Sequence, residues 1–335
     1  MQFPTQLPLD SAPALGPNTA PAPSATFQGT IQPPTTWDPY ATPGIEAPAL
    51  FPQDPTLPNL PPSTFGPGGG FATAQRFLQE VRLDYQWLVG NGADEFGVND
   101  IGASATFAFP FFYNQQNPLL VTPGFGLHLF QGPQRPPPQD LPGSVYDAYL
   151  DAAWNPQLVP EVGADLAVRV GVYTDFSTFD KDSIRLTGHG YGVLSFSPSF
   201  KIKAGVIYLD RVKVKILPAG GIIWTPNPDV RFDILFPNPR LARRLGTSGN
   251  TDWWLYFRGE YGDGAWTIKH ADDTFDRIDY NDIRIALGLE FRGLRGTTGH
   301  FEVGGSFDRE IVYHDSPNHT FRPNSTVFLG GGVTY

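Results

Sequence analysis

Two groups of histidine and aspartate residues are the first candidates for chemistry in this sequence: His270 with Asp272 and Asp273, and His314 with Asp315 and His319. A histidine titrates near neutral pH, and a neighbouring carboxylate can orient it for acid–base chemistry or share a metal ion with it. Neither group has the spacing of a known catalytic or metal-binding motif, and short matches of this kind arise by chance in loops. We therefore expect solvated loop residues and no metal site, and surface-loop hydrolase activity is the third of three functional alternatives.

Composition excludes several other kinds of chemistry. The chain has no cysteine, which removes disulfides, thiolate metal sites and cysteine nucleophiles. Its 335 residues include 23 basic and 33 acidic side chains, and the net charge of -10 argues against nucleic acid as a partner. The glycine-rich stretch 66–70 lacks the Lys-Ser or Lys-Thr of a phosphate-binding loop. We expect no catalytic residues, no cofactor and no nucleic-acid partner.

Strict alternation of apolar and polar residues is the main structural signal. From Ile283 to Phe291 every second residue is Ile, Leu or Phe, and the residues between them are Arg, Ala, Gly and Glu. This period of two is typical of a β-strand with two different faces. The run has roughly the 9 to 11 residues that a tilted strand needs to cross a bilayer. Val81–Val89 and Trp253–Tyr261 repeat the pattern.

Fourteen such segments predict an all-β fold, a transmembrane antiparallel β-barrel of about 14 strands (roughly 12 to 16). The other eleven segments are Ile101–Phe109, Leu119–Leu129, Tyr146–Trp154, Ala164–Tyr173, Ile184–Phe196, Phe200–Tyr208, Ala219–Trp224, Val230–Phe236, Ala265–His270, Phe301–Tyr313 and Ser325–Tyr335. Leu241–Leu245 alternates poorly and is assigned to a loop, because single-chain bacterial barrels prefer an even strand count. Gly262–Gly264 is assigned to a short turn on the side of the chain termini.

The two faces of these segments predict an apolar exterior and a polar interior. Soluble sandwiches also alternate, and large aromatic residues could fill a soluble core. One face of the segments carries charges of both signs in mid-strand, and the other face is rich in aromatic residues. This arrangement favours the membrane barrel. The charged residues expected to line the pore are Arg82, Asp84, Asp165, Arg169, Asp233, Arg258, Glu260, Arg284, Glu290, Glu302 and Asp308. His128 and His189 fall on the same inward face, where we expect hydrogen bonds inside the lumen.

Aromatic residues near the strand ends predict two interfacial girdles. On the rim of the chain termini we expect Trp154, Tyr261, Trp266, Phe291, Phe301 and Tyr335. On the other rim we expect Trp87, Trp253 and Tyr313.

Residues 1–75 differ from the rest of the chain and are interpreted as a proline-rich, irregular periplasmic tail or linker, followed by the barrel at 76–335. The first 70 residues have no Lys or Arg, hold about half of the prolines and show no apolar periodicity. Pro52, Pro55, Pro58 and Pro61 recur at every third residue, which matches polyproline II.

The end of the chain resembles the closing strand that barrel assembly machinery recognises, with the aromatic Tyr335 preceded by alternating Val333, Leu329 and Val327, although Gly331 departs from the pattern. The chain from about residue 75 onward also resembles an uncharacterised planctomycete-type family of outer-membrane β-barrel proteins. Leu217–Pro226 and Tyr280–Arg284 carry this second resemblance. It implies the fold and an outer-membrane location, and it supplies no substrate and no catalytic residues.

Transport is the leading functional hypothesis. Barrels of about eight strands fill with side chains and those of sixteen to eighteen leave a water channel, so about fourteen strands is an intermediate case. We expect a porin-like channel for small solutes in a bacterial outer membrane. The alternative is a non-conducting anchor that links the membrane to the cell wall or another envelope protein through residues 1–70. The expected partners are outer-membrane lipid and the barrel assembly machinery, and the oligomeric state stays open.

Overall fold

The computed structural model describes residues 77–90, 95–111, 114–133, 135–137, 139–177, 181–211, 215–293, 297–315 and 320–335. The predicted tail, residues 1–75, lies outside these residues. Within them the chain is almost entirely β-strand, with one short 3-10 helix at Lys181–Ser183. Among the described residues, no helix has the length and apolar character needed to cross a membrane.

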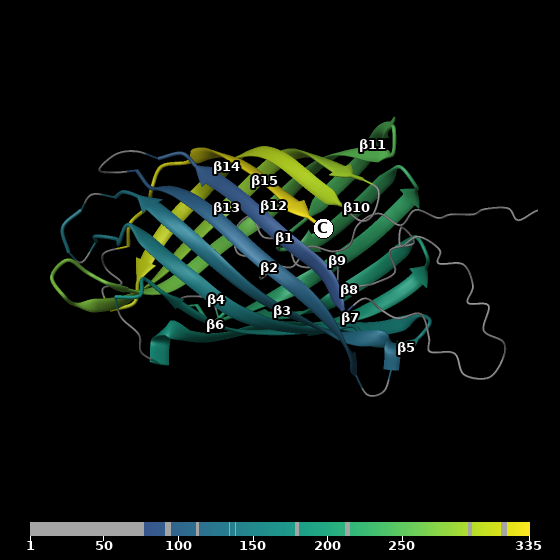
Figure 1. Cartoon of the computed structure of the whole chain (residues 1–335), viewed down its shortest axis with the longest axis horizontal. Helices are drawn as coiled ribbons and strands as arrows, with labels where there is room; N and C mark the ends of the chain where they lie inside the picture. The colour runs from purple at the N-terminus through teal and green to yellow at the C-terminus, as the bar shows by residue number, and fades with distance from the viewer. Residues whose placement is uncertain are drawn as a thin grey trace, which may run out of the picture. The chain divides into compact units, whose positions relative to one another are not determined.

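The strands form one closed antiparallel barrel. They are β1 (Leu78–Leu88), β2 (Gly97–Phe111), β3 (Asn114–Gln131), β4 (Ser144–Trp154), β5 (Gln157–Val159), β6 (Val162–Thr174), β7 (Ile184–Ser197), β8 (Phe200–Tyr208), β9 (Ile216–Asn227), β10 (Val230–Phe236), β11 (Arg240–Ser248), β12 (Thr251–Lys269), β13 (Phe275–Arg292), β14 (Thr298–Tyr313) and β15 (Thr326–Thr334). Strands that follow one another in the sequence pair with each other, except that β4 pairs with β6 and not with β5, and β1 closes the ring on β15. Figure 1 shows the strands crossing the barrel wall diagonally.

The wall contains fourteen strands, because β4 pairs directly with β6 and the three-residue β5 contacts β6 alone. The predicted all-β barrel of about 14 strands is therefore confirmed.

The strand ends define two rims. We call the rim where β1 begins and β15 ends the terminus-side rim, since Val81 and Tyr335 exchange backbone hydrogen bonds there. The far end is the opposite rim.

The predicted number of strands is right, but two of the predicted segment assignments are wrong. The segment that was assigned to a loop, Leu241–Leu245, lies inside β11, where both edges are paired, to β10 and to β12. Backbone pairing on two sides stabilises this strand although its side chains alternate poorly.

The second error concerns the glycines at 262 and 264, which form no turn. β12 runs without a break from Thr251 to Lys269 and pairs with β13 along its whole length. These glycines make room for neighbouring side chains: a Cβ at Gly262 would meet the carboxylate of Asp282, and one at Gly264 would meet the ring of Trp266. One strand thus replaces the two that were predicted, and the two errors cancel in the count.

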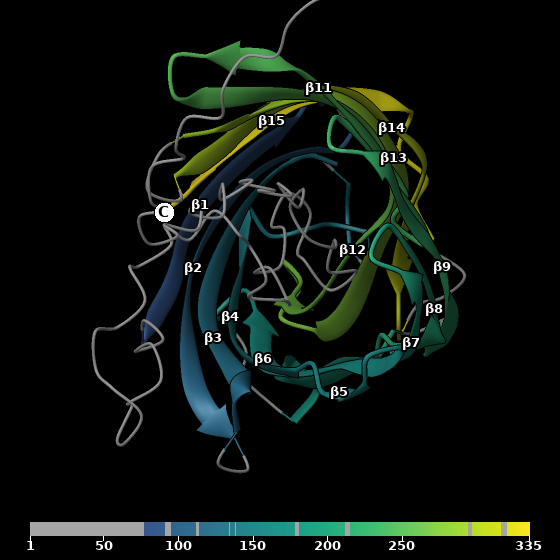
Figure 2. The same cartoon turned by 90° about the vertical axis from the view of Figure 1, so that its right-hand side faces the viewer.

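The distal part of the long β12–β13 pair bends across the lumen at the opposite rim and contacts β4 and β6, whereas its tip, residues 271–275, is exposed. We call residues 265–278 the inner hairpin. In β12 and β13 the alternation of burial stops there, and Trp266, Thr267 and Ile268 are all buried in succession. Thr267 also forms a bridge with Thr174 of β6, a strand on the opposite side of the ring. Figure 2, a view into one end of the barrel, shows β12 within the ring of strands.

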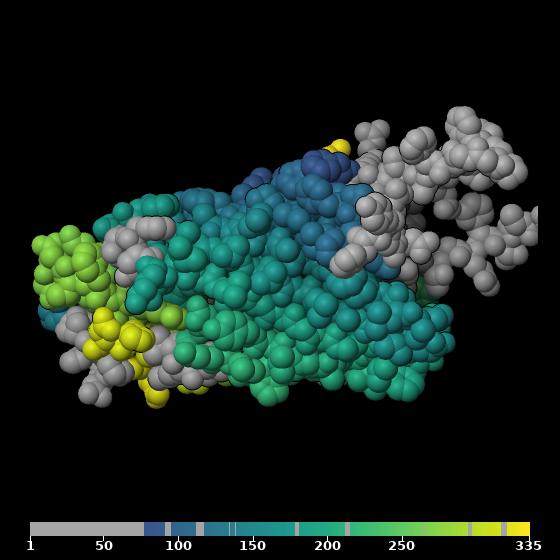
Figure 3. Space-filling model, turned by 90° about the horizontal axis from the view of Figure 1, so that it is seen from below, coloured from purple at the N-terminus to yellow at the C-terminus, as the bar shows by residue number. Residues whose placement is uncertain are grey.

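The inner hairpin packs into an apolar cluster that we call the luminal core. Its buried members are Leu88, Phe96, Val98, Phe130, Val145, Trp266, Ile268, Ile278, Tyr280, Ala286, Ile311, Tyr313, Phe321 and Phe328. They come from strands around the ring and from the hairpin itself. The outward-facing residues are also apolar but exposed, and in Figure 3 the middle strands of the chain, in teal, form a closed outer wall.

Candidate functional site in the barrel interior

The barrel interior holds most of the charged residues that the sequence placed there. Buried side chains on the inward face are Arg82, Asp84, Asp165, Arg169, Asp233, Arg258, Glu260, Arg284, Glu290 and Glu302. Alternation along each strand brings them inside, because the residues next to them in the chain face outward.

Asp308 is the exception, and the prediction for it is wrong. The pairing of β13 with β14 shifts by one residue between Asn281 and Ile283, and Asp308 has a left-handed backbone with φ 46°. This bulge turns Asp308 outward and the next residue, Arg309, inward. The buried Arg309 donates from Nε to Tyr280 Oη over 2.9 Å and from Nη2 to the Phe96 carbonyl. Nothing in the sequence marks the bulge, so Arg309 was missed.

Many of the inward charges are paired with each other, some within one strand and others between strands. Arg258 of β12 donates from Nε to Glu302 of β14 over 2.7 Å and also pairs with Glu260. Arg284 donates to Asp282 over 2.8 Å, and Arg169 holds Asp151 through two hydrogen bonds of 2.6 and 2.7 Å. Such local pairs neutralise the wall. They produce no ring of one sign of the kind that selects ions.

The aromatic residues divide into an exposed and a buried group. Trp87, Phe301 and Tyr335 are exposed, and Trp154, Tyr261 and Phe291 are half-buried. Trp253 lies on the terminus-side rim, where its ring packs on Phe291 at 5.7 Å between centroids, and not on the opposite rim as predicted. The unbroken course of β12 is the reason, since it reverses the direction that the sequence analysis gave this segment.

Trp266 and Tyr313 face the interior, which contradicts their predicted interfacial positions. Both belong to the luminal core. Trp266 donates from Nε1 to Asp147 of β4 over 2.6 Å, and Tyr313 donates to the Gln139 carbonyl over 2.9 Å. Their polar atoms find partners inside the barrel, so these residues fasten the inner hairpin and its surroundings to the opposite wall.

His128 and His270 also make contacts in the barrel interior. His128 bridges Asp100 at 2.6 Å and Asp147 at 3.0 Å, as expected for a luminal hydrogen bond. His270, next to the tip of the inner hairpin, is buried and contacts Asp140 at 2.8 Å, so it is no solvated loop residue as predicted. His314 is exposed beside Asp315, and His319 lies outside the described residues.

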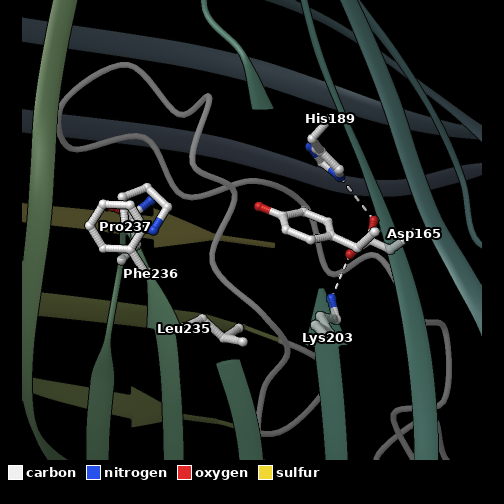
Figure 4. A pocket seen from close by; sticks show the side chains of 8 residues that line it. Asp165, His189, Lys203, Leu235, Phe236 and Pro237 are labelled. Atoms are coloured by element: carbon white, nitrogen blue, oxygen red, sulfur yellow. Dashed lines mark hydrogen bonds and ion pairs between the residues drawn. The ribbon is translucent and has the colours of Figure 1, made fainter. Parts of the chain in front are cut away.

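A small cavity of about 20 Å³ lies against the wall of β6, β7 and β8 (Figure 4). Asp165 accepts hydrogen bonds there from Lys203 over 2.5 Å and contacts His189 Nε2 at 3.0 Å, the second predicted luminal contact. Phe236 and Pro237 close the other side. This space holds about one water molecule.

A second cavity, of about 50 Å³, lies between the inner hairpin and the wall. Its lining comes from β4, β6, β7, the segment after β8, and β12, and it includes three arginines: Arg169, Arg185 and Arg211. Within the described ranges, no group of three or more His, Asp or Glu residues is placed to hold a metal ion.

Comparisons with known proteins return solved structures only. No family model and no curated protein matches the chain. A bacterial polysaccharide outer membrane secretin is similar at 11% identity and a TM-score of 0.37 over 76% of this chain and 97% of that one. LpxR from Salmonella typhimurium is similar at 8% identity and a TM-score of 0.33 over 77% and 99%. OccK7 (OpdD) from Pseudomonas aeruginosa is similar at 10% identity and a TM-score of 0.24 over 76% and 97%. The barrel assignment therefore rests on this chain's own strand pairing.

Proposed function

We propose that the chain is an integral outer-membrane barrel and that its lumen is a channel for small solutes, closed at rest by the inner hairpin. The outward face supports the membrane location. Between 283 and 289 in β13, Ile283, Ile285, Leu287 and Leu289 are all exposed, and their inward neighbours Arg284 and Ala286 are buried. Soluble monomers rarely expose apolar patches beyond a few hundred Å², and a bilayer would cover this surface.

The attachment of the inner hairpin supports a gated lumen, and it is the single observation on which the channel proposal depends. The hairpin reaches the far wall through a few polar contacts: Trp266 to Asp147, His270 to Asp140, the Lys269 amide to Asp175 at 2.9 Å, and the Thr267–Thr174 bridge. A segment held to the far wall by a handful of hydrogen bonds can move as a unit about its base in the sheet.

A reversible disulfide tests this gate. Thr174 and Thr267 are bridge partners, so cysteines at both positions meet the distance requirement for a disulfide, and the chain has no other cysteine. In planar bilayers we expect the oxidised double variant to show no current and the reduced protein to show step-like openings. Thr267→Cys alone is the control and should not respond to oxidant. Equal currents in the oxidised and reduced double variant would contradict the gate.

A non-conducting anchor is the second candidate, and the luminal core favours it. Moving the hairpin would expose the side chains of Trp266, Ile268 and Ile278, and each large apolar side chain contributes about 1.5–3 kcal/mol when buried. One variant distinguishes the channel from the anchor. Replacing residues 265–279 with an Asn-Gly turn joins the paired residues Gly264 and Tyr280 and removes the hairpin. Openings in that folded variant support the channel, and silence supports the anchor.

A further inference from the structure

We propose that the cavity under the inner hairpin is a binding site for a small oxyanion of the phosphate or sulfate type. This site goes beyond the channel function and is independent of whether the barrel conducts. Its lining combines the guanidinium groups of Arg169, Arg185 and Arg211 with the side chains of Thr187 and Trp266. Arginine is suited to oxyanions because its planar fork of N–H donors matches two oxygens at once.

Two of these arginines have polar contacts within the protein. Arg169 directs Nε and Nη2 at the two carboxylate oxygens of Asp151. Arg211 donates from Nη1 to the side-chain oxygen of Asn281 over 2.7 Å.

Arg185 is different, and it carries the proposal. Its side chain is 3% exposed, yet Nε and Nη2 are buried and have no hydrogen-bond partner in the described part of the chain. Nη1 lies 3.5 Å from the Asp210 carbonyl and 3.9 Å from Asp279 Oδ1. Nε and Nη2 form the same edge with which Arg169 grips Asp151, so Arg185 presents a bidentate fork to which the described residues supply no acceptor.

Among the described residues, no carboxylate near the cavity accepts a hydrogen bond from Nε or Nη2 of Arg185. Asp147, the acidic residue of the lining, accepts from Trp266 through Oδ1 over 2.6 Å and contacts His128 Nε2 through Oδ2 at 3.0 Å. Asp279 lies 3.9 Å from Arg185 and also 3.9 Å from Arg277. A buried guanidinium edge without an acceptor is costly, and a bound oxyanion would relieve that cost.

Size and access narrow the ligand class. A space of about 50 Å³ suits a single tetrahedral anion and excludes a nucleotide or a phosphorylated sugar. Gly264, Ala265 and Trp266 form one side of the cavity, so the base of the inner hairpin covers the site.

Binding of inorganic phosphate to the purified full-length protein in detergent tests the site. Unfolding temperature and equilibrium dialysis would be measured against phosphate, sulfate and chloride at equal ionic strength. We expect saturable stabilisation by phosphate and sulfate and none by chloride. Arg185→Gln should weaken phosphate binding by roughly tenfold to hundredfold, the range for hydrogen bonds to a charged group. Arg231→Gln is the matched control, because Arg231 is buried elsewhere in the lumen and donates to Asp233 over 2.8 Å.

Arg185→Lys keeps the test valid if the glutamine variant fails to fold, since it retains the charge and loses the fork; we expect it to bind phosphate more weakly than the native protein. Equal responses to phosphate and chloride in the native protein would overturn the proposal, as would unchanged affinity in Arg185→Gln or Arg185→Lys. These outcomes are separate from the bilayer recordings, because a silent barrel can still bind phosphate and a conducting one can fail to.

Discussion

Asp147 illustrates how much a single side chain contributes to closing this barrel. It is fully buried, and its two oxygens hold residues from two other strands, His128 of β3 and Trp266 of β12. The sequence placed His128 correctly on the inward face. It gave no reason to join Asp147 to a tryptophan 119 positions later, because that contact depends on where the inner hairpin folds.

His270 predicts a pH dependence of the hairpin contact. The nearby carboxylate of Asp276, with Nε2 to Oδ2 at 3.8 Å, and the hydrogen-bonded Asp140 raise the pKa of His270 above its usual 6.5, against the opposing effect of burial. A group whose pKa rises on folding contributes its stability fully below its unfolded pKa and loses it as pH rises through the folded pKa. The contact of the hairpin with Asp140 should therefore be strongest below about pH 6.5, and it should weaken as the pH rises through the raised pKa of His270.

Proteolysis of the native protein in detergent, sampled across pH, would measure this weakening at the loop 271–274. Tyr313, whose ring packs against His270, and the two carboxylates are the other titratable groups that contact the histidine. His270→Gln is the control and should flatten the profile. A cleavage profile that keeps the same pH dependence in this variant would rule out the histidine as its source.

At the scale of single residues, alternation predicted which side chains face inward wherever a strand is regular. It failed at Asp308, where a bulge shifts the parity, and at Trp266 and Tyr313, where both faces of a strand are buried. These failures have two physical origins: a bulge changes which residues share a face, and the structure that covers a face is set by distant parts of the chain.

Among the elements, β11 and β12 show what strand pairing decides beyond local pattern. Arg240–Ser248 becomes a strand because two partners supply its backbone hydrogen bonds. Gly262 and Gly264 are typical of a turn by composition, yet they lie within a strand that pairs with β13 along its whole length. A Cβ at these positions would clash with the side chain of Asp282 or of Trp266. Neither outcome is visible in a window of ten residues, although the alternation in β13 correctly predicted its extended wall segment.

The outward face of β13 predicts the response to a misplaced charge. Leu287 is exposed in mid-strand, and an arginine there would lie near the centre of a bilayer. We expect Leu287→Arg to lower the free energy of unfolding in lipid vesicles by about 2–4 kcal/mol, with Val333→Arg near the rim costing about 0–1 kcal/mol. Urea titration of the two variants checks this. Equal, small losses at both positions would contradict a lipid-facing wall.

For the molecule as a whole, the closed ring of fourteen strands predicts a simple behaviour on gels. A barrel without free edges resists detergent, because every wall strand is paired on both sides. We expect the detergent-extracted protein to migrate differently before and after boiling on a denaturing gel. Identical migration, or a compact monomer that stays soluble without detergent, would contradict the membrane proposal. The fold class was accessible from the sequence, and the strand number came out right because the errors at β11 and β12 cancelled. The filled lumen was not accessible, since it arises from contacts between residues far apart in the chain.

The inner hairpin also constrains the order of biogenesis. β1 and β15 form the seam of the ring, and the hairpin must reach β4 and β6, made more than ninety residues earlier, inside that ring. Such long sequence separations slow folding. The hairpin can therefore dock only after β4 and β6 are in place, and we expect its docking to be a late step of insertion.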